Sequence, residues 1–196
     1  MESKLYLLSG TPGTGKTTVA KKLKDNNFSI ISLGDFVIQN NLFCEEDKKR
    51  DTKIIDEEKI NSFFSKYLSN NKFSIPIIIE SHYADIIDLP CEIAIILRCH
   101  PQILEKRLQS RNYSPEKIRE NIQAELLGDS TSHMLEREDL IEKGSIFEIN
   151  SSNLTIEETA NKIAEIIQKP ENFQDLKAGW LSWLSDPTVQ MENYLD

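Results

Sequence analysis

The chain has 196 residues and a formal net charge of −9 at pH 7. The acidic surplus argues against broad, nonspecific nucleic-acid binding but suits a basic protein partner. The length predicts one domain with small inserts. Three cysteines without a CxxC pair predict reduced thiols in a cytoplasmic protein. We expect no membrane contact, since no apolar run approaches a membrane span and the first residues carry no leader pattern.

A glycine-rich loop follows the first predicted strand, residues 5–8, and precedes apolar positions at helical spacing. Residues 10–18 read GTPGTGKTT and match the P-loop pattern G-x-x-x-x-G-K-[ST], which lies between a strand and a helix. Gly13 and Gly15 lack a Cβ, so backbone N–H groups can converge there on phosphate oxygens. The positive end of the following helix strengthens this attraction. The sequence therefore predicts a nucleoside triphosphate site.

Polar side chains near this loop predict its chemistry. Lys16 is expected to reach the β- and γ-phosphates, and the Thr17 hydroxyl to ligate Mg²⁺. A P-loop also needs an acidic group at the end of a neighbouring strand, and Glu80 closes the apolar run 77–79. His82 lies two residues further, at the sheet edge where ligands gather in open α/β folds. We expect it to position water or a phosphoryl acceptor, or to relay a proton.

The remaining strands and helices alternate along the chain. Helices are expected after the acidic start at Asp56, from Pro101 onward, and after a capping-box pattern at residues 155–158. Short apolar runs between them predict strands, at Phe28–Ser32, Ile75–Ile79, Ile93–Leu97 and Ile146–Ile149. This alternation predicts a parallel sheet covered by helices.

Two polar segments fit the sheet poorly, residues 35–53 and 109–121. Such inserts in a P-loop fold carry the second substrate and a closing lid, and the alternative is that both are solvated faces. Arg107 and Arg111 are expected one turn apart on a single helix face, where guanidinium groups can neutralise a transferring phosphoryl group.

The segment beyond Pro170 carries apolar residues at helical spacing, namely Phe173, Leu176, Trp180, Trp183 and Leu184. We expect this stripe to pack on the domain, because two exposed tryptophans would be unusual for a protein surface. A partner-binding helix is the alternative.

Several of these segments together resemble the adenylate kinase isoenzyme 6 family, including its archaeal members. The similarity extends from about Leu5 to Ile167, and the match of the tail is weaker. It is carried by LSGTPGTGKTT at 8–18, ISLGD at 31–35, ESHY at 80–83, LR at 97–98, EKRLQSRNY at 105–113 and KIRENIQAE at 117–125.

The resemblance implies an α/β nucleoside monophosphate kinase fold with a five-stranded parallel sheet. We expect a kinase domain at 1–169, with a monophosphate-binding insert at about 35–57 and a lid at about 109–121, followed by a tail at 170–196. The family is associated with phosphoryl transfer from ATP to AMP and with ATP hydrolysis, both using Mg²⁺. It is also associated with small ribosomal subunit maturation through a basic platform ribosomal protein, which the acidic charge of this chain would suit.

The resemblance also assigns roles by position. Gly13, Gly15, Lys16, Thr17, Thr18 and Arg111 resemble the ATP site. Lys16, Glu80, His82 and Arg111 are the expected catalytic residues, and Thr17 and Glu80 hold the metal, directly or through water. Gly34, Asp35 and Arg107 are expected to contact the monophosphate.

Three positions depart from the family pattern. Ile38 stands where many adenylate kinases place the arginine that grips AMP, so Arg50 or Lys53 would have to substitute. Glu80 replaces an aspartate. Asn112 replaces a glycine, and asparagine tolerates the positive φ that such a turn needs.

These departures leave two further readings beside the nucleotide kinase. The first is an ATP-driven assembly factor with residual kinase activity, which the missing arginine favours. The second is a kinase for another small metabolite, since the fold alone does not fix the substrate.

Overall fold

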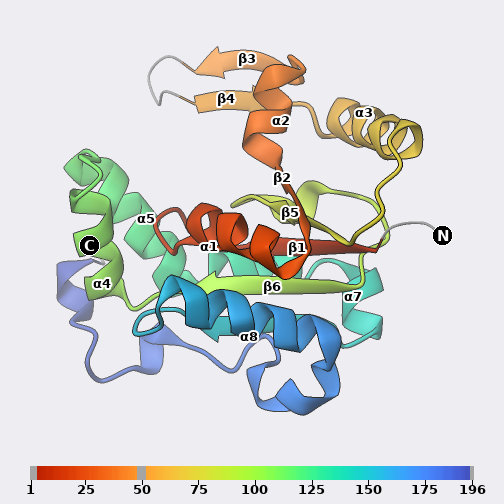
Figure 1. The fold of residues 1–196 in the computed structure, drawn as a ribbon. Coiled ribbons are helices and arrows are strands. Elements are labelled where there is room, and N and C mark those ends of the chain that lie inside the picture. The colour runs from red at the N-terminus through yellow and green to blue at the C-terminus, as the bar shows by residue number, and fades with distance from the viewer. Residues whose placement is uncertain (1–3, 48–51, 195–196) are drawn as a thin grey trace.

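A five-stranded parallel sheet forms the centre of the protein, as the sequence predicts. The structure is a computed structural model that describes residues 4–47 and 52–194. The strand order is β2-β5-β1-β6-β7, and every neighbouring pair is parallel. The strands are β1 (Leu5–Ser9), β2 (Ser29–Ser32), β5 (Ile77–Glu80), β6 (Ile93–Arg98) and β7 (Ile146–Asn150). The P-loop follows the central strand β1, so it lies at the carboxyl edge of the sheet (Figure 1).

Helices cover both faces of this sheet. Helices α1 (Lys16–Leu23) and α8 (Ile156–Gln168) pack on one face, where their apolar side chains share a buried cluster with Tyr6 and Leu8 of β1. The other face is covered by α2 (Leu33–Gln39), α3 (Glu57–Asn70), α6 (Asp129–Met134) and α7 (Glu138–Glu142). The alternation of side chains along β1 explains the two cores, because Leu5 and Leu7 point to the second face.

The polar segment that was expected to be an insert forms a hairpin. Strands β3 (Phe43–Asp47) and β4 (Thr52–Ile55) pair only with each other, and Figure 1 shows them standing away from the main sheet beside α2. Phe36 of α2 anchors this region, since its ring packs edge-on against Phe64 of α3 with 5.0 Å between the ring centroids. Arg50, a candidate substitute for the missing arginine, lies outside the described residues, as does the side chain of Lys53.

The expected lid is a tight connection between two helices, α4 (Pro101–Gln109) and α5 (Pro115–Leu127). Asn112 adopts φ 58° in this turn, the positive φ that asparagine was expected to tolerate here. Because α4 ends at Gln109, Arg107 and Arg111 do not share one helix face, and that expectation was wrong.

The tail was expected to pack on the domain, and Trp183 does so in a buried cluster with Leu104 and Leu108. The helical spacing of its apolar residues does not produce an α-helix within the described residues. The tail forms short 3-10 turns, at Pro170–Leu176, Trp183–Ser185 and Met191–Asn193. Gly179 breaks the pattern with φ 93°, in the region where glycine is favoured. Trp183 is buried at 2% exposure, whereas Trp180 remains 46% exposed. Helical spacing therefore predicted the wrong conformation and the wrong environment for one of the two tryptophans.

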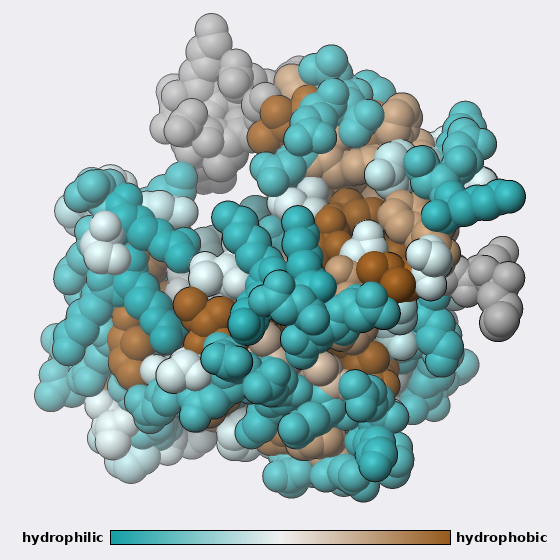
Figure 2. Space-filling model, viewed as in Figure 1, coloured by the Kyte–Doolittle hydropathy of each residue, from teal (hydrophilic) through white to brown (hydrophobic). Residues whose placement is uncertain are grey.

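The surface is mostly hydrophilic on the face shown in Figure 2, with hydrophobic groups between the inserts and the sheet. Within residues 4–47 and 52–194, the helices are too short or too polar for any of them to span a bilayer.

The capping box before α8 provides a test of this local structure. Thr155 accepts the backbone N–H of Glu158, and the Glu158 side chain accepts the backbone N–H of Thr155. Thr155→Ala should lower the free energy of unfolding by about 1 kcal/mol and Tm by about 2–4 °C in thermal denaturation. Thr155→Ser keeps the hydroxyl and should match the wild type; equal loss in both variants would contradict the capping role.

Candidate functional site

The P-loop adopts the backbone that its glycines predict. Gly15 has φ 109° and serves as the N-cap of α1, so the first N–H groups of that helix are free of intrahelical partners. Gly13 has φ 97°, and a Cβ there would lie 2.7 Å from Leu104 of α4. The loop is therefore shaped for an anion and packed closely against α4.

Lys16 is buried at the start of α1 and folds back over the loop. Its Nζ donates to the carbonyl oxygens of Gly10 at 2.5 Å and Thr11 at 3.1 Å. Burial lowers the pKa of Lys16 to about 8, although the charges of Glu80 and Glu125 act in the opposite direction. The ammonium group is thus weakly solvated, and an anion in the loop offers it a stronger partner than two neutral carbonyls.

The side-chain oxygen atoms of Thr17 and Glu80 lie close together beside the P-loop. The Thr17 hydroxyl lies 3.3 Å and 3.4 Å from the two carboxylate oxygens of Glu80, which is the last residue of β5 and is 5% exposed. A hydroxyl and a carboxylate are suitable ligands for Mg²⁺, which binds few protein groups and keeps several waters. The described residues contain no cluster of three or more His, Cys, Asp or Glu side chains that suits a metal. This donor set fits Mg²⁺ held beside a phosphate.

His82 lies just beyond β5, with its ring 4.1 Å from that of Tyr83 between centroids. Desolvation by the surrounding protein atoms and the positive charge of Lys16 lower the pKa of His82 to about 4. The imidazole is therefore neutral at pH 7, with one nitrogen able to accept a proton or a hydrogen bond.

One cavity of about 270 Å³ joins most of the expected site residues. It is lined by Pro12, Gly13, Gly15, Lys16, Thr17, Ser32, Gly34, Glu80, Ser81, His82, Arg111 and Tyr113. These come from the P-loop, the ends of β2 and β5, and the α4–α5 turn, segments far apart in the sequence. Thr18 is exposed on the first turn of α1 and does not line this cavity.

A second cavity of about 300 Å³ adjoins the first, because Thr17, Ser32 and Glu80 line both. Asp35 lines only this second cavity, together with Lys21 of α1 and Lys24, which directly follows that helix. Sequence analysis missed the two lysines, although their spacing three residues apart places them on one helix face. Ile38 lines neither cavity and is 52% exposed.

Arg107 has a different environment from Arg111. Its guanidinium donates to the carbonyl oxygens of Thr14 at 3.3 Å and Ser151 at 3.2 Å. It therefore braces the back of the P-loop against the loop after β7 and does not line the cavity that holds Arg111.

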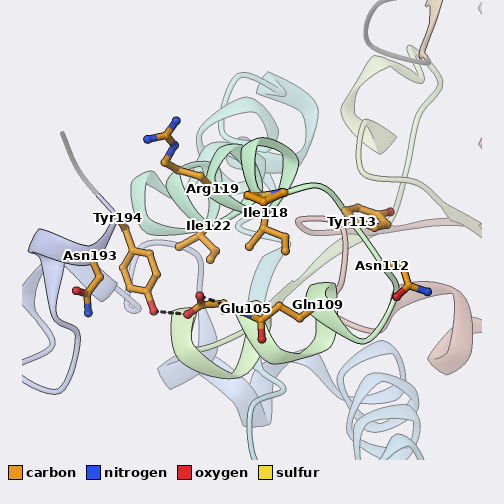
Figure 3. Close-up of a pocket in the computed structure, with 10 residues that line it drawn as sticks. Glu105, Gln109, Asn112, Tyr113, Ile118, Arg119, Ile122, Asn193 and Tyr194 are labelled. Atoms are coloured by element: carbon orange, nitrogen blue, oxygen red, sulfur yellow. Dashed lines mark hydrogen bonds between the residues drawn. The ribbon is translucent and has the colours of Figure 1, made fainter.

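A larger groove of about 490 Å³ lies between α4, α5 and the tail (Figure 3). Ile118 and Ile122 form its apolar side, and the Tyr194 hydroxyl donates to Glu105 at 3.0 Å across one end. It shares only Tyr113 with the Lys16 cavity, so it is separate from the candidate site.

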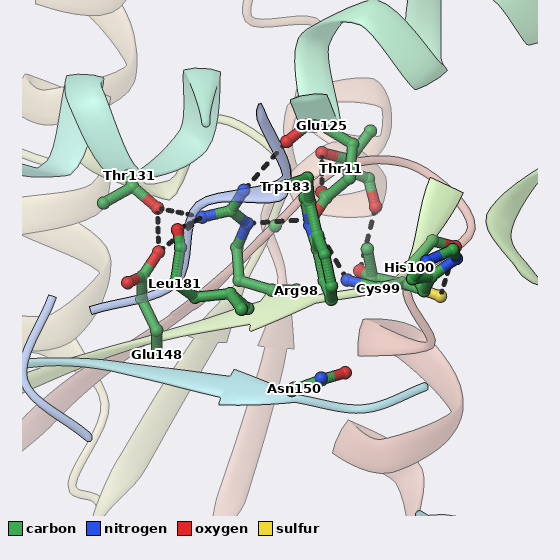
Figure 4. A network of polar contacts seen from close by, with 12 residues as sticks. Thr11, Arg98, Cys99, His100, Glu125, Thr131, Glu148, Asn150, Leu181 and Trp183 are labelled. Carbon is green, nitrogen blue, oxygen red and sulfur yellow. Dashed lines mark hydrogen bonds and ion pairs between the residues drawn. The ribbon is translucent and has the colours of Figure 1, made fainter. Parts of the chain in front are cut away.

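A buried polar network connects the P-loop to the tail, and sequence analysis gave no sign of it. The Glu125 carboxylate accepts three side-chain hydrogen bonds, from Thr11 Oγ1 at 2.5 Å, Arg98 Nε at 2.8 Å and Trp183 Nε1 at 2.9 Å (Figure 4). Arg98 also pairs with Glu148 at 2.5 Å. The only available signal was the presence of charged residues within apolar stretches. Because an unpaired buried charge is costly, such residues indicate buried partners elsewhere in the chain.

The chain is similar to several known proteins. A family model described as an AAA domain matches residues 7–128. A protein of Methanosarcina acetivorans named "Putative adenylate kinase" is 37% identical over 189 residues, covering 90% of this chain and 96% of that protein. A Methanocaldococcus jannaschii protein of the same name is 33% identical, covering 82% of this chain and 84% of its own.

A solved structure of thymidylate kinase from Candida albicans covers 87% of this chain and 93% of its own at a TM-score of 0.54. Its sequence identity of 15% makes this a likeness of fold alone, and that fold is the P-loop nucleoside monophosphate kinase fold. The archaeal proteins are similar over most of the chain, at 37% identity over 90% of it and 33% over 82% of it. The chain therefore belongs to the family of archaeal proteins that carry the name "Putative adenylate kinase", the archaeal branch of the family its motifs resemble.

Proposed function

We propose that this protein transfers the γ-phosphoryl group of ATP to a nucleoside monophosphate, with AMP as the acceptor, and that it also hydrolyses ATP. The observation that carries the proposal is the single cavity shared by Lys16, Glu80 and Arg111 beside the P-loop. The archaeal relatives carry the name "Putative adenylate kinase", which supports the choice of AMP.

Phosphoryl transfer needs positioning and charge neutralisation more than covalent help. The loop around Gly13 and Gly15 and the start of α1 would bind the phosphates of ATP, with Thr18 on the first turn. Lys16 would leave its carbonyl partners for the β- and γ-phosphates, and Arg111 would approach from the lid to neutralise charge on the transferring group. Neutral His82 would orient the acceptor oxygen or, during hydrolysis, the attacking water.

Thr17 and Glu80 would hold Mg²⁺, with water completing the shell where the longer Glu80 side chain leaves room. When bound, the ion neutralises charge shared by the β- and γ-phosphates. Burial of Glu80 keeps its carboxylate fixed toward Thr17.

The second cavity is the proposed acceptor site. Gly34 and Asp35, in the first turn of α2, line the first and the second cavity respectively, so a monophosphate there would face the γ-phosphate over Thr17 and Glu80. Lys21 and Lys24 supply positive charge in this cavity. We propose that Arg107 contributes to nucleotide binding indirectly, because its hydrogen bond to the Thr14 carbonyl holds the P-loop in position.

An ATP-driven assembly factor acting on the small ribosomal subunit is the second candidate. The exposure of Ile38 favours it, because no cation occupies that position. A basic platform ribosomal protein would be attracted by the net charge of −9.

Lys16→Ala should abolish both activities, with ADP formation falling about 10²-fold or more because a central charge on the phosphates is lost. A coupled assay measures ADP with and without AMP. Strong stimulation of the wild type by AMP supports the kinase, whereas stimulation by a platform ribosomal protein alone supports the assembly factor. Normal turnover by Lys16→Ala would refute the site.

ATP affinity should depend on the protonation of Lys16. Bound phosphates favour the charged amine and raise its pKa above the value of about 8 in the free protein. Binding therefore takes up a proton at higher pH, and affinity should be constant below pH 8 and fall about tenfold per pH unit above it. Titration calorimetry from pH 6.5 to 9.5 measures this. Lys16→Arg stays charged and should give a flat profile; a flat wild-type profile would contradict the mechanism.

His82→Ala should slow ATP hydrolysis about 10²-fold, since a group that positions water is lost, while ATP affinity changes little. Steady-state hydrolysis and equilibrium binding separate the two effects. His133→Ala, on α6 and outside the cavity that His82 lines, is the matched control. An unchanged hydrolysis rate in His82→Ala would reduce this residue to a structural role.

A further inference from the structure

We infer that the C-terminal tail is part of the nucleotide site, because the indole of Trp183 positions the P-loop through the buried carboxylate of Glu125. The inference rests on the proposed binding of ATP at the P-loop. It makes Glu125 and Trp183 positioning residues, since neither lines the cavity that holds Lys16.

The contacts form a continuous path between distant segments. Trp183 donates its indole N–H to Glu125 Oε1 at 2.9 Å, and the other oxygen of that carboxylate accepts the Thr11 hydroxyl at 2.5 Å. The path is dry, since Thr11 is 3% exposed, Glu125 1% and Trp183 2%. Two side-chain hydrogen bonds therefore connect the tail to the loop, and the burial of all three side chains keeps solvent from replacing either partner.

The carboxylate of Glu125 is held in place by fixed donors. Arg98 Nε donates to Oε1 at 2.8 Å, and the backbone N–H of Cys99 donates to the same oxygen at 3.0 Å. With these donors in place, loss of the indole N–H removes one of the groups that set its orientation. A shift of the carboxylate reaches Thr11 directly, because its hydroxyl is bonded to the other oxygen.

The tail also packs on α4, the helix that lies against the P-loop. Trp183, Val189 and Tyr194 share a buried cluster with Leu104 and Leu108 of α4, and with apolar residues of α5. Leu104 and Leu108 are also the side chains that a Cβ at Gly13 would meet. Tail and P-loop therefore lie next to the same two leucines of α4, and Figure 1 shows the last labelled part of the tail beside α4.

Coupling between two sites is reciprocal, so ordering of the P-loop by ATP must strengthen the seating of the tail as much as the tail strengthens ATP binding. The two tryptophans permit a matched test. Trp180 also donates an indole hydrogen bond, to the Glu148 carbonyl at 3.3 Å, but it has no contact with Glu125. Each tryptophan changed to phenylalanine thus loses one N–H donor from the same tail.

Trp183→Phe should weaken ATP binding about fivefold or more, within the usual range of coupled sites. Trp180→Phe should stay within about twofold of the wild type, because the bond it loses ends on a backbone carbonyl and not on the Glu125 carboxylate. Calorimetric titration of the full chain with Mg²⁺ and ATP measures both, at a temperature where thermal denaturation shows each variant folded. Equal affinity in the two variants would overturn the inference.

A spectroscopic readout separates coupling from loss of structure. The chain has two tryptophans, so Trp180→Phe leaves Trp183 as the single emitter, with its N–H on a carboxylate and its ring against His100. Saturating ATP should change its emission, and the change should disappear when Thr11→Val removes the connecting hydroxyl. Two results would contradict the path. One is that ATP leaves the emission of Trp180→Phe unchanged, and the other is that ATP changes it equally when Thr11→Val is added.

Lys16→Ala distinguishes failure of this inference from failure of the proposed function. If Lys16→Ala loses ATP binding while both tryptophan variants bind normally, the nucleotide site stands and the tail is not coupled to it. If Lys16→Ala binds ATP as well as the wild type, the proposed nucleotide site is itself wrong, and the inference falls with it.

Discussion

The arrangement of the whole carboxyl edge depends on one buried ionic group. Arg98 at the end of β6 is 2% exposed and lies between the carboxylates of Glu125 and Glu148, which come from α5 and β7. Burial of one cation with two anions adds little net stability, and removal of one partner is costly because it leaves a charge unpaired. The cluster therefore acts as a constraint on position. It fixes α5, the last strand and the tail against the strand beside the P-loop.

The P-loop is shaped by what lies behind it as much as by what it binds. Gly10 has no room for a side chain, since a Cβ would lie 2.3 Å from the Leu97 carbonyl, and Gly13 meets α4 in the same way. Two of the three loop glycines thus permit close packing, whereas Gly15 faces open space and serves the helix start. The same sequence pattern meets two physical needs, a concave set of N–H groups and a tight contact with β6 and α4.

Local patterns predicted the sheet, the capped helix α8 and the P-loop because each depends on residues close in sequence. Residues 77–79 of β5 are apolar without alternation since both faces are covered, and Thr155 caps its own helix. The site was predictable where one segment carries it, as at Lys16 and Thr17. The path from Thr11 to Glu125 joins residues 114 positions apart, and no spacing rule relates them. The tail failed for a related reason, because Gly179 and long-range bonds override its helical periodicity.

Thr11 makes two separate contacts, one with Lys16 and one with Glu125, so the loss of the first need not shift the P-loop. Its carbonyl accepts Lys16 Nζ at 3.1 Å, whereas its hydroxyl donates to Glu125. In the proposed function Lys16 must leave that carbonyl to reach a phosphate, and the loop would then lose an internal contact when it needs a fixed shape. The bond to Glu125 uses a different atom of the same residue, so it would persist when Lys16 moves in the proposed function. A mobile lysine and a fixed loop are compatible because the fixed contact points away from the nucleotide, toward the tail.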